Sequence, residues 1–434
     1  MAILYSYYGD DFTGSTDVLE QLGSNGVPGV LFLGVPTAAH VAAFPDVQAI
    51  GLAGDSRSRS PEWMSANLPT IFGRLKEFGA PVAHYKVCST FDSSPMAGSI
   101  GRAMEIGREV FSPRFIPIVV GAPHLRRYVA FGNLFAADAD GVVQRIDRHP
   151  MSRHPVTPMH EADLRVHLAA QGEAGVGLAD LATLKCGDAV DRVASLIASG
   201  CAGILFDTVD AETQEAVGQV LWNEAQRAPM FSVGSSGLTA ALIATWRQAG
   251  MLPPAPLPRA LEASRPLLVV SGSCSVKTQR QIEHALAHGY SGVRLDPAAW
   301  MEPAGHARSV AFDTAGRALA DGRDTVVYTA LGPTDAPAHG EELGVGLGVL
   351  LRDLLRRAHS AGAPVGRVMI GGGDTSSHAV QQLGLHALTW VANLQPGGPL
   401  CRAHADSELD GMELVLKGGQ VGSDDFFDVV RGDG

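Results

Sequence analysis

Six short apolar runs constrain the fold of this 434-residue chain more than any other feature of its sequence. The runs are VQAIGLAG (47–54), FIPIVVGAP (115–123), AGILFDTV (202–209), PLLVVSGSCS (266–275), DTVVYTALG (324–332) and VGRVMIGGGD (365–374). Short runs of this kind, ending in glycine or small polar residues, are typical of buried parallel strands. Helical patterns lie between them, as in CSVKTQRQIEHALAHG (274–289) and LGVLLRDLLRRAHSAG (347–362). The sequence therefore predicts an α/β fold of mostly parallel sheets flanked by helices.

A proline-rich stretch divides the chain. GMLPPAPLPRALEASRP (250–266) contains five prolines and follows the helical pattern GLTAALIATWRQAG. Proline cannot continue a helix, and proline-rich sequence tends to be extended. Because the chain is also too long for one ordinary core, we expect two domains, 1–250 and 267–434, with a linker at 251–266 and a ligand cleft between the domains.

Composition excludes several classes of protein. The formal charge of −12 argues against nucleic acid as the main partner. No segment reaches the roughly 18 consecutive apolar residues of a membrane span, and the start MAILYSYYGDD lacks the basic region of a signal peptide. The five cysteines are scattered, with no C-x-x-C pair, which indicates reduced thiols and a cytoplasmic protein. A homodimer is the expectation from base rates.

Three loops rich in small residues follow expected strands in the second half. They are VVSGSCSVKT (269–278), MIGGGDTSSHAVQQLG (369–384) and LKGGQVGSDDFF (416–427). Ligands of open α/β sheets bind at the carboxyl ends of strands. In the second loop the glycines allow close approach to a ligand, Thr375 or Ser376 is expected to cap the following helix, and Asp374 is a candidate Mg²⁺ ligand. These loops together predict a phosphate site.

Each loop also has a simpler interpretation. A single loop of this kind is often a tight turn without a ligand, and Lys417 is either a surface lysine at a strand end or a positive charge that neutralises phosphate. The stretch GVGLGV (344–349) resembles a dinucleotide-binding turn, but it precedes a leucine-rich helix instead of following a strand. We interpret it as close helix packing.

The first half places acids and hydroxyls after its expected strands. Asp10 and Asp11 come where the first strand ends, so that one carboxylate can act on a substrate hydroxyl while the other caps the next helix. The alternative is a pair of capping residues only. Arg57, after the second strand, is either an anion holder or part of a solvated loop.

HYKVCSTFDSSPMAGSIGRAMEIG (84–107) begins as a strand and continues as a hydroxyl-rich loop that suits a polyhydroxylated ligand. Its polar residues include Lys86, Ser89, Thr90, Asp92 and Ser93. Cys88 has no identifiable histidine partner, so a structural thiol is expected there. His284 and His288 have the spacing of a metal pair but no third ligand, so exposed helix histidines are expected. An anion-holding half and a phosphate-binding half together fit phosphoryl transfer to a small hydroxy acid.

At these residues the sequence resembles the four-carbon acid sugar kinase family over nearly its whole length. The family's motifs appear in order as GDDFTGS (9–15), Ser56–Arg57, GSSG (234–237), SGSCS (271–275), GGDTS (372–376), PGGP (396–399) and KGGQVG (417–422). The resemblance implies an ATP-dependent kinase with an N-terminal sugar-acid domain and a C-terminal nucleotide domain.

The resemblance also implies roles for particular residues. Asp10 or Asp11 would orient or deprotonate the hydroxyl, and Arg57, Lys86, Ser89, Thr90 and Asp92 would bind the acid sugar. Mg²⁺ and ATP would be held by Ser271, Ser273, Gly372, Gly373, Asp374, Thr375, Ser376, Lys417, Gly418, Gly419, Gln420, Val421 and Gly422.

Two stretches bear on the substrate. YKVCSTFDSS (85–94) is similar to the branch that phosphorylates 3-oxo-tetronates, whereas GSIGRA (98–103) departs from that branch. A 3-oxo-tetronate is therefore the leading expectation, and a branched relative such as 3-oxo-isoapionate is the alternative. Gly418 and Gln420 stand where the family usually has serine and asparagine. Two other classes stay open: a dinucleotide-dependent oxidoreductase, which GVGLGV would favour, and a sugar-acid sensor without turnover.

Overall fold

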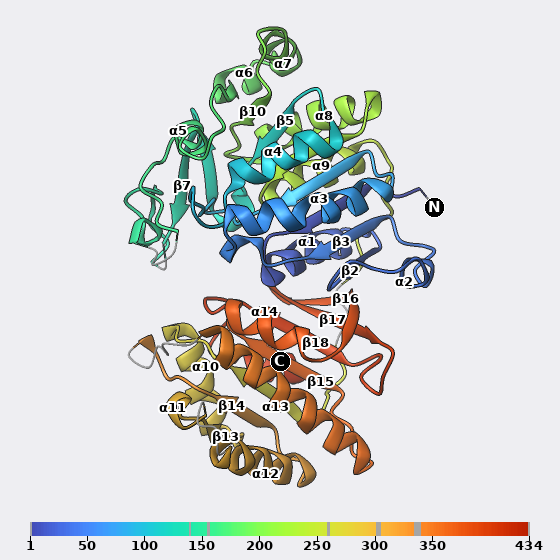
Figure 1. The fold of residues 1–434 in the computed structure, drawn as a ribbon, viewed down its shortest axis with the longest axis vertical. Helices are drawn as coiled ribbons and strands as arrows, with labels where there is room; N and C mark the ends of the chain where they lie inside the picture. The colour runs from blue at the N-terminus through green and yellow to red at the C-terminus, as the bar shows by residue number, and fades with distance from the viewer. Residues whose placement is uncertain are drawn as a thin grey trace. The chain divides into compact units, whose positions relative to one another are not determined.

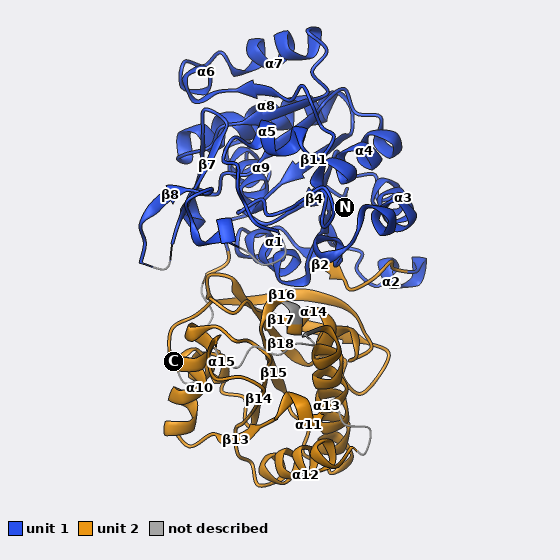
Figure 2. Ribbon diagram, turned by 60° about the vertical axis from the view of Figure 1, so that its left-hand side comes forward, with its two compact units in different colours: residues 1–29, 37–255 blue, residues 30–36, 256–434 orange. Residues whose placement is uncertain are grey.

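The chain forms two compact units, shown by colour in Figure 2. The computed structural model describes residues 2–138, 140–153, 157–257, 261–300, 305–333 and 340–432. The first unit contains residues 1–29 and 37–255, and the second contains residues 30–36 and 256–434. Segment 30–36 therefore joins the second unit although the chain on both sides of it belongs to the first. The predicted assignment of 1–250 and 267–434 to two binding domains stays a prediction.

The first unit is built on a parallel sheet (Figure 1). Across the sheet the strands are β3 (Ala49–Ala53), β1 (Tyr5–Gly9), β4 (Val82–Lys86), β11 (Met230–Gly234), β5 (Ile116–Val119), β10 (Gly203–Phe206) and β9 (Gly177–Ala179). All neighbouring pairs are parallel. Their carboxyl ends therefore lie along one edge, where an open α/β sheet binds its ligands.

Helices connect these strands. They are α1 (Phe12–Ser24), α2 (Ala38–Ala42), α3 (Pro61–Glu77), α4 (Ile100–Phe111), α5 (Leu164–Ala169), α6 (Leu181–Lys185), α7 (Ala189–Ala198), α8 (Ala211–Arg227) and α9 (Ser236–Gln248), with short 3₁₀ turns η1 (Ser56–Ser58), η2 (Pro123–Leu125) and η3 (Pro150–Arg153). A separate antiparallel sheet contains β6 (Arg127–Ala130), β7 (Asn133–Ala137) and β8 (Val143–Arg145). Among the described residues, no helix is both long and apolar enough to cross a membrane.

The second unit has a mixed sheet. Its parallel strands are, in order, β13 (Ser291–Arg294), β14 (Thr325–Tyr328), β12 (Leu267–Ser271), β15 (Arg367–Gly371) and β18 (Glu413–Lys417). The antiparallel strands β17 (Gly398–Ala405), β16 (Leu385–Gln395) and β2 (Gly29–Phe32) follow. The helices are α10 (Val276–Ala287), α11 (Pro297–Trp300), α12 (His306–Ala320), α13 (Gly340–Ser360), α14 (Gly373–Gln381) and α15 (Phe426–Arg431).

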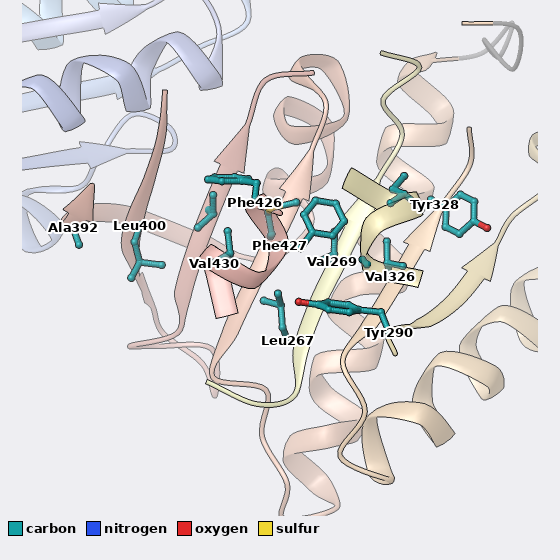
Figure 3. Packing of buried hydrophobic residues seen from close by; sticks show 14 residues of the cluster. Leu267, Val269, Tyr290, Val326, Tyr328, Ala392, Leu400, Phe426, Phe427 and Val430 are labelled. Carbon is teal, nitrogen blue, oxygen red and sulfur yellow. The ribbon is translucent and has the colours of Figure 1, made fainter. Parts of the chain in front are cut away.

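Apolar side chains cover both faces of this sheet. Leu267 and Val269 of β12 pack with Phe426 and Phe427 of α15 in one cluster (Figure 3). The alternate residues Leu268 and Val270 are also fully buried. Burial on both faces explains why the strand sequence is continuously apolar instead of alternating.

The structure confirms the predicted fold class. Each of the six apolar runs contains a parallel strand, and the two helical patterns form α10 and α13. The antiparallel hairpin β16–β17 and the small sheet of β6, β7 and β8 were not predicted, because their strands lack a continuous apolar run. In β16, for example, buried and partly exposed residues are mixed.

Candidate functional site

Adjacent strands bring the predicted acids and lysine of the first unit together. β1 lies between β3 and β4, and Gly9 pairs with both Ala53 and Lys86. Asp10 directly follows β1, and its amide donates a hydrogen bond to the Lys86 carbonyl at 2.9 Å. Arg57 follows β3 in η1, and its amide donates to the Asp10 carbonyl at 3.0 Å. Three residues that are distant in sequence are thus tied at one edge of the sheet.

The Arg57 guanidinium donates hydrogen bonds to both Asp10 and Asp11. Its Nε and Nη2 donate to the Asp10 carboxylate at 3.2 and 2.7 Å, and its Nη1 and Nη2 donate to the Asp11 carboxylate at 3.1 and 3.0 Å. The paired acids raise the pKa of Arg57 well above its ordinary value despite burial. Here Arg57 positions the acids; its predicted contact with a substrate stays a prediction.

Asp10 and Asp11 have different surroundings. Asp11 is the N-cap of α1, and its Oδ1 accepts a hydrogen bond from the Gly14 amide at 2.8 Å. Asp10 is only 4% exposed, and it is not the N-cap of α1. Burial, together with the Asp11 charge, raises the pKa of Asp10 to about 6, and Arg57 offsets part of that rise. A carboxylate with a pKa near neutrality is suited to general-base catalysis.

Lys86 is a buried cation beside acidic side chains. It is 3% exposed, and its Nζ makes no hydrogen bond to any described residue. Its ion-pair partner is Asp17, at 3.7 Å. Lys86 also lies against the first turn of α1, since a Cβ placed on Gly14 would be 3.0 Å from Nζ. A helix N-terminus disfavours a cation, so an anionic oxygen would be bound strongly beside this ammonium.

The loop after β4 is more buried than its composition indicates. Thr90 and Asp92 are 6% and 7% exposed, and Thr90 Oγ1 lies 2.6 Å from Asp92 Oδ1 and 2.9 Å from Cys88 Sγ. Ser89 is partly exposed. Burial and the Asp92 charge raise the pKa of Cys88, so this thiol lacks the low pKa of a nucleophilic thiolate.

Sequence reasoning missed several residues at this edge. Asp17 pairs with Lys86 from the second turn of α1, and Thr157 Oγ1 donates to Asp92 Oδ2 at 3.4 Å. Asp17 follows the motif GDDFTGS by two positions, so helical spacing could have predicted that Asp17 lies near the motif. Thr157 stands 65 residues from its partner, and no local pattern indicates that contact.

In the second unit the three predicted loops converge. β12, β15 and β18 are consecutive parallel strands, and their last residues are in register: Ser271 pairs with Gly371, which pairs with Lys417. The loops SGSCS, GGDTS and KGGQVG therefore begin side by side. The Gly372 amide donates to the Lys417 carbonyl at 2.8 Å, and the Gly272 amide donates to the Gly371 carbonyl at 3.2 Å.

Lys417 is fully buried, which excludes the interpretation as a surface lysine. Its Nζ donates to Thr278 Oγ1 at 3.0 Å and to the Gly418 carbonyl at 3.1 Å, and the Gly419 carbonyl lies 3.5 Å away. Burial, and secondarily the charge of Lys277, lowers the pKa of Lys417 to about 7. In this arrangement Lys417 holds the loop that follows it.

That loop has two backbone amides without a hydrogen bond to the described residues. Ser275 Oγ and Thr278 Oγ1 both donate to the Gly419 carbonyl, the latter at 3.0 Å. In a trans peptide the next N–H points opposite to the carbonyl, so the amides of Gly419 and Gln420 point away from Lys417 and α10. Neither amide donates a hydrogen bond to any described residue. Two successive amides without a described partner are available to donate hydrogen bonds to an anion such as phosphate.

Two helix N-termini flank these loops. Ser275 caps α10 by accepting from the Thr278 amide at 3.0 Å, and the preceding turn is closed by Ser271 and Ser273, whose hydroxyls accept from backbone amides. α14 begins after Gly372 and has no side-chain cap. The first-turn N–H groups of α14 therefore remain available to an anion.

The expectation that Thr375 or Ser376 caps α14 is wrong. The cap position is Gly372, whose φ of 111° is open to glycine but not to side-chain-bearing residues. Ser376 instead donates from its hydroxyl to the Ile370 carbonyl at 3.2 Å, and Thr375 Oγ1 lies against Gly272. The predicted Mg²⁺ ligand, the Asp374 side chain, lies outside what the structure describes.

His284 and His288 stack with ring centroids 4.0 Å apart. His288 is exposed as expected, whereas His284 is partly buried and its Nε2 lies 2.9 Å from Asp428. The expectation of close helix packing at GVGLGV is confirmed. GVGLGV lies inside α13 and packs against neighbouring elements: a Cβ on Gly348 would lie 2.6 Å from the Ala379 backbone. It is not a dinucleotide turn, which removes the support for an oxidoreductase.

Two family models match the chain, a sugar-binding N-terminal domain over residues 5–242 and a nucleotide-binding C-terminal domain over residues 268–427. The chain is 46% identical to a 3-oxo-isoapionate kinase from Paraburkholderia graminis, covering 99% of this chain and 94% of that protein. It is 31% identical to a 3-oxo-tetronate kinase from Pectobacterium atrosepticum, covering 96% of each. A crystal structure of a Haemophilus influenzae protein superposes with a TM-score of 0.74 at 25% identity, covering 98% of this chain and 99% of that one.

Identity to the 3-oxo-isoapionate kinase is higher than identity to the 3-oxo-tetronate kinase. The two relatives agree on the class of reaction. The chain belongs to the four-carbon acid sugar kinase family and is a carbohydrate-acid kinase.

Proposed function

We propose that the protein transfers the γ-phosphoryl group of ATP to a terminal hydroxyl of a branched 3-oxo acid sugar such as 3-oxo-isoapionate. The observation that carries this proposal is the 46% identity to a 3-oxo-isoapionate kinase across 99% of the chain. The departure of GSIGRA (98–103) from the 3-oxo-tetronate branch agrees with it. Cytoplasmic location and a homodimer are part of the same proposal.

In the first unit, Lys86 is assigned to the carboxylate or oxo group of the acid sugar. It is a buried ammonium without a hydrogen bond among the described residues, and an anionic oxygen would satisfy it. Asp10 is assigned as general base because its pKa is raised and it has no capping role. Arg57 and Asp11 hold Asp10 in place, and Ser89, Thr90 and Asp92 contact the hydroxyls.

In the second unit, the free amides of Gly419 and Gln420 and the uncapped start of α14 are assigned to the phosphates of ATP. Ser271, Ser273 and Lys417 shape the surrounding backbone through the contacts described above. Mg²⁺ prefers oxygen ligands and retains waters, and Asp374, Ser273 and Thr375 would be its candidate oxygen donors. The ion would neutralise charge on the phosphates.

The chemistry follows from these assignments. The terminal hydroxyl oxygen forms a bond to the γ-phosphorus while the bond to the ADP oxygen breaks, and the hydroxyl proton passes to Asp10. A phosphoryl-transfer enzyme works mainly by positioning and by stabilising charge. The buried Lys86 and the loop amides provide fixed positive charge without reorganisation.

The test is ADP release from the purified protein with Mg-ATP and a panel of acids: threonates, erythronates, their 3-oxo forms and 3-oxo-isoapionate. We expect the highest kcat/KM with 3-oxo-isoapionate. A higher value with a 3-oxo-tetronate would overturn the substrate assignment. ATP binding without turnover on any acid would favour a sensor instead of a kinase.

Lys86→Met separates binding of the acid from binding of ATP. We expect KM for the acid to rise by about tenfold or more, since a charged contact contributes about 1.5–3 kcal/mol, while KM for ATP stays near the wild-type value. Lys185→Met is the matched control, because Lys185 is a surface lysine paired with Asp210 and Glu212. An unchanged KM for the acid in Lys86→Met would contradict the role of Lys86.

A further inference from the structure

We propose that His167 and Gln171 are positioning residues for the substrate-binding loop 88–93, acting through Ser93. The inference rests on the proposed function, because it concerns how Thr90 and Asp92 are held for the acid sugar. Neither residue belongs to a motif singled out in the sequence. Both come from the segment of α5 and the turn that follows it.

Three polar side chains form a closed triangle. His167 Nε2 lies 2.9 Å from Ser93 Oγ, and Gln171 Nε2 lies 2.9 Å from both Ser93 Oγ and His167 Nε2. Ser93 is 1% exposed and its hydroxyl lies 3.1 Å from the Phe91 carbonyl. Ser93 therefore faces the protein, so the sequence-based expectation that it suits a ligand does not describe its contacts here.

The hydrogen atoms of the triangle can be assigned. The Gly101 amide can only donate, and it donates to Gln171 Oε1 at 3.3 Å, which fixes the orientation of the Gln171 amide. Gln171 Nε2 is then the donor to both His167 Nε2 and Ser93 Oγ. The single Ser93 hydrogen is donated to the Phe91 carbonyl, so the contact between His167 Nε2 and Ser93 Oγ contains no hydrogen. An Nε2 that accepts carries no proton, so His167 is neutral. Burial lowers the pKa of His167 to about 4, which agrees with this assignment.

The triangle holds a strained part of the loop. Phe91 has a φ of 56°, a left-handed conformation that a bulky residue keeps only when its surroundings impose it. The Ser93 hydroxyl donates to the Phe91 carbonyl, and the Phe91 ring lies against His167 with centroids 6.0 Å apart. Phe91 stands between Thr90 and Asp92, so its backbone conformation sets where both side chains point.

Gln171 also binds the segment that begins α4, at Ser99 and Gly101. Gln171 Oε1 accepts from Ser99 Oγ at 3.4 Å as well as from the Gly101 amide. Just before Ser99, the Gly98 amide donates to the Arg59 carbonyl at 2.9 Å, and a Cβ on Gly98 would lie 2.3 Å from the Arg57 carbonyl oxygen. Gln171 thus connects the hydroxyl-rich loop to the segment that packs against Arg57. This segment includes the residues that depart from the 3-oxo-tetronate branch.

The test compares two substitutions at one position. His167→Phe keeps an aromatic ring against Phe91 but removes the acceptor, whereas His167→Gln places an acceptor where Nε2 was. We expect His167→Phe to raise KM for the acid sugar by about tenfold, with kcat and the KM for ATP within about twofold of wild type, and His167→Gln to restore most of the loss. Val166→Ala, an exposed neighbour on α5, is the control and should match wild type.

A second measurement does not depend on kinase activity. Amide hydrogen exchange at residues 90–93 should be faster in His167→Phe than in wild type, while exchange in β4 stays the same. Faster exchange without a KM effect would overturn the functional role and leave a structural one. An equal rise in the KM values for the acid sugar and for ATP would overturn the inference itself. Amide exchange at the wild-type rate in His167→Phe would also overturn it. Wild-type protein that binds no acid sugar would instead refute the proposed function.

Discussion

Two adjacent aspartates show how position decides chemistry at the scale of single residues. Asp11 accepts a hydrogen bond from the Gly14 amide and caps α1, whereas Asp10 directly follows β1 and is buried against Arg57. The two carboxylates share Arg57, but only Asp11 also accepts a backbone amide of α1. The pKa of Asp10 is raised because burial disfavours its charge more than Arg57 restores it.

This difference predicts a pH profile. A general base must be ionised, so kcat should rise as the pH increases through about 6, the pKa of Asp10, and level off above it. Asp10→Asn should lower kcat by about 10²-fold or more and abolish this limb, with ATP binding retained. Rates measured from pH 5 to 8 check the profile.

Asp11→Asn is the matched variant for Asp10→Asn. Asparagine can still cap a helix, so this change should cost α1 little stability and should lower kcat much less than Asp10→Asn does. Equal losses of kcat in both variants would contradict the assignment of Asp10 as the base.

At the scale of elements, glycine spacing in α13 controls how closely helices approach. Gly344, Gly346 and Gly348 face His378, Trp300 and Ala379, and a Cβ at Gly348 would lie 2.6 Å from the Ala379 backbone. Ala379 belongs to α14, whose N-terminus is assigned to phosphate. The packing of α13 on α14 therefore bears directly on the helix that is proposed to bind phosphate.

Gly348→Ala should force α13 and α14 apart. We expect a loss of about 1–3 kcal/mol in the free energy of unfolding and a raised KM for ATP, with the KM for the acid unchanged. Gly73→Ala is the matched control, since Gly73 lies inside α3 with open space around it. The control should gain about 0.5–1 kcal/mol, because alanine favours a helix. Denaturant unfolding measures the free energy of unfolding of both variants. A Gly348→Ala variant as stable as wild type would contradict the packing argument.

At the scale of the whole molecule, the chain does not divide at a single point. Residues 30–36 belong to the second unit, where Val30, Leu31 and Phe32 of β2 pair with β16. The second unit therefore takes an edge strand from the first 36 residues of the chain. Without that strand, β16 would expose unpaired backbone groups and apolar side chains, which is a hazard for aggregation.

A fragment of residues 256–434 should consequently be less stable than the same fragment with residues 29–36 joined through a flexible linker. We expect the thermal midpoint of the shorter fragment to be lower by at least about 5 °C, with self-association at high concentration. Thermal unfolding and sedimentation measure both effects. Equal midpoints and monomeric behaviour in both fragments would show that β2 is dispensable.

Much of this architecture follows from local sequence. The apolar runs predicted the parallel strands, because strands buried on both faces must be apolar throughout. The three small-residue loops follow neighbouring strands, and their binding of a ligand stays a prediction. The family motifs extended this to a kinase. The substrate stays a prediction: YKVCSTFDSS favours a 3-oxo-tetronate, whereas GSIGRA and the 46% identity to a 3-oxo-isoapionate kinase favour the alternative.

The sequence by itself determined the fold class, the loops at the strand ends and the acids and cations that those loops carry. The tertiary structure alone decided which groups meet: Arg57 on both aspartates, Lys417 beneath its own loop, and His167 and Gln171 on Ser93. The physical reason is the range of the interactions. Strand and helix patterns depend on neighbours along the chain, whereas burial, ion pairing and hydrogen-bond partners depend on residues that are tens of positions apart and adjacent only after folding.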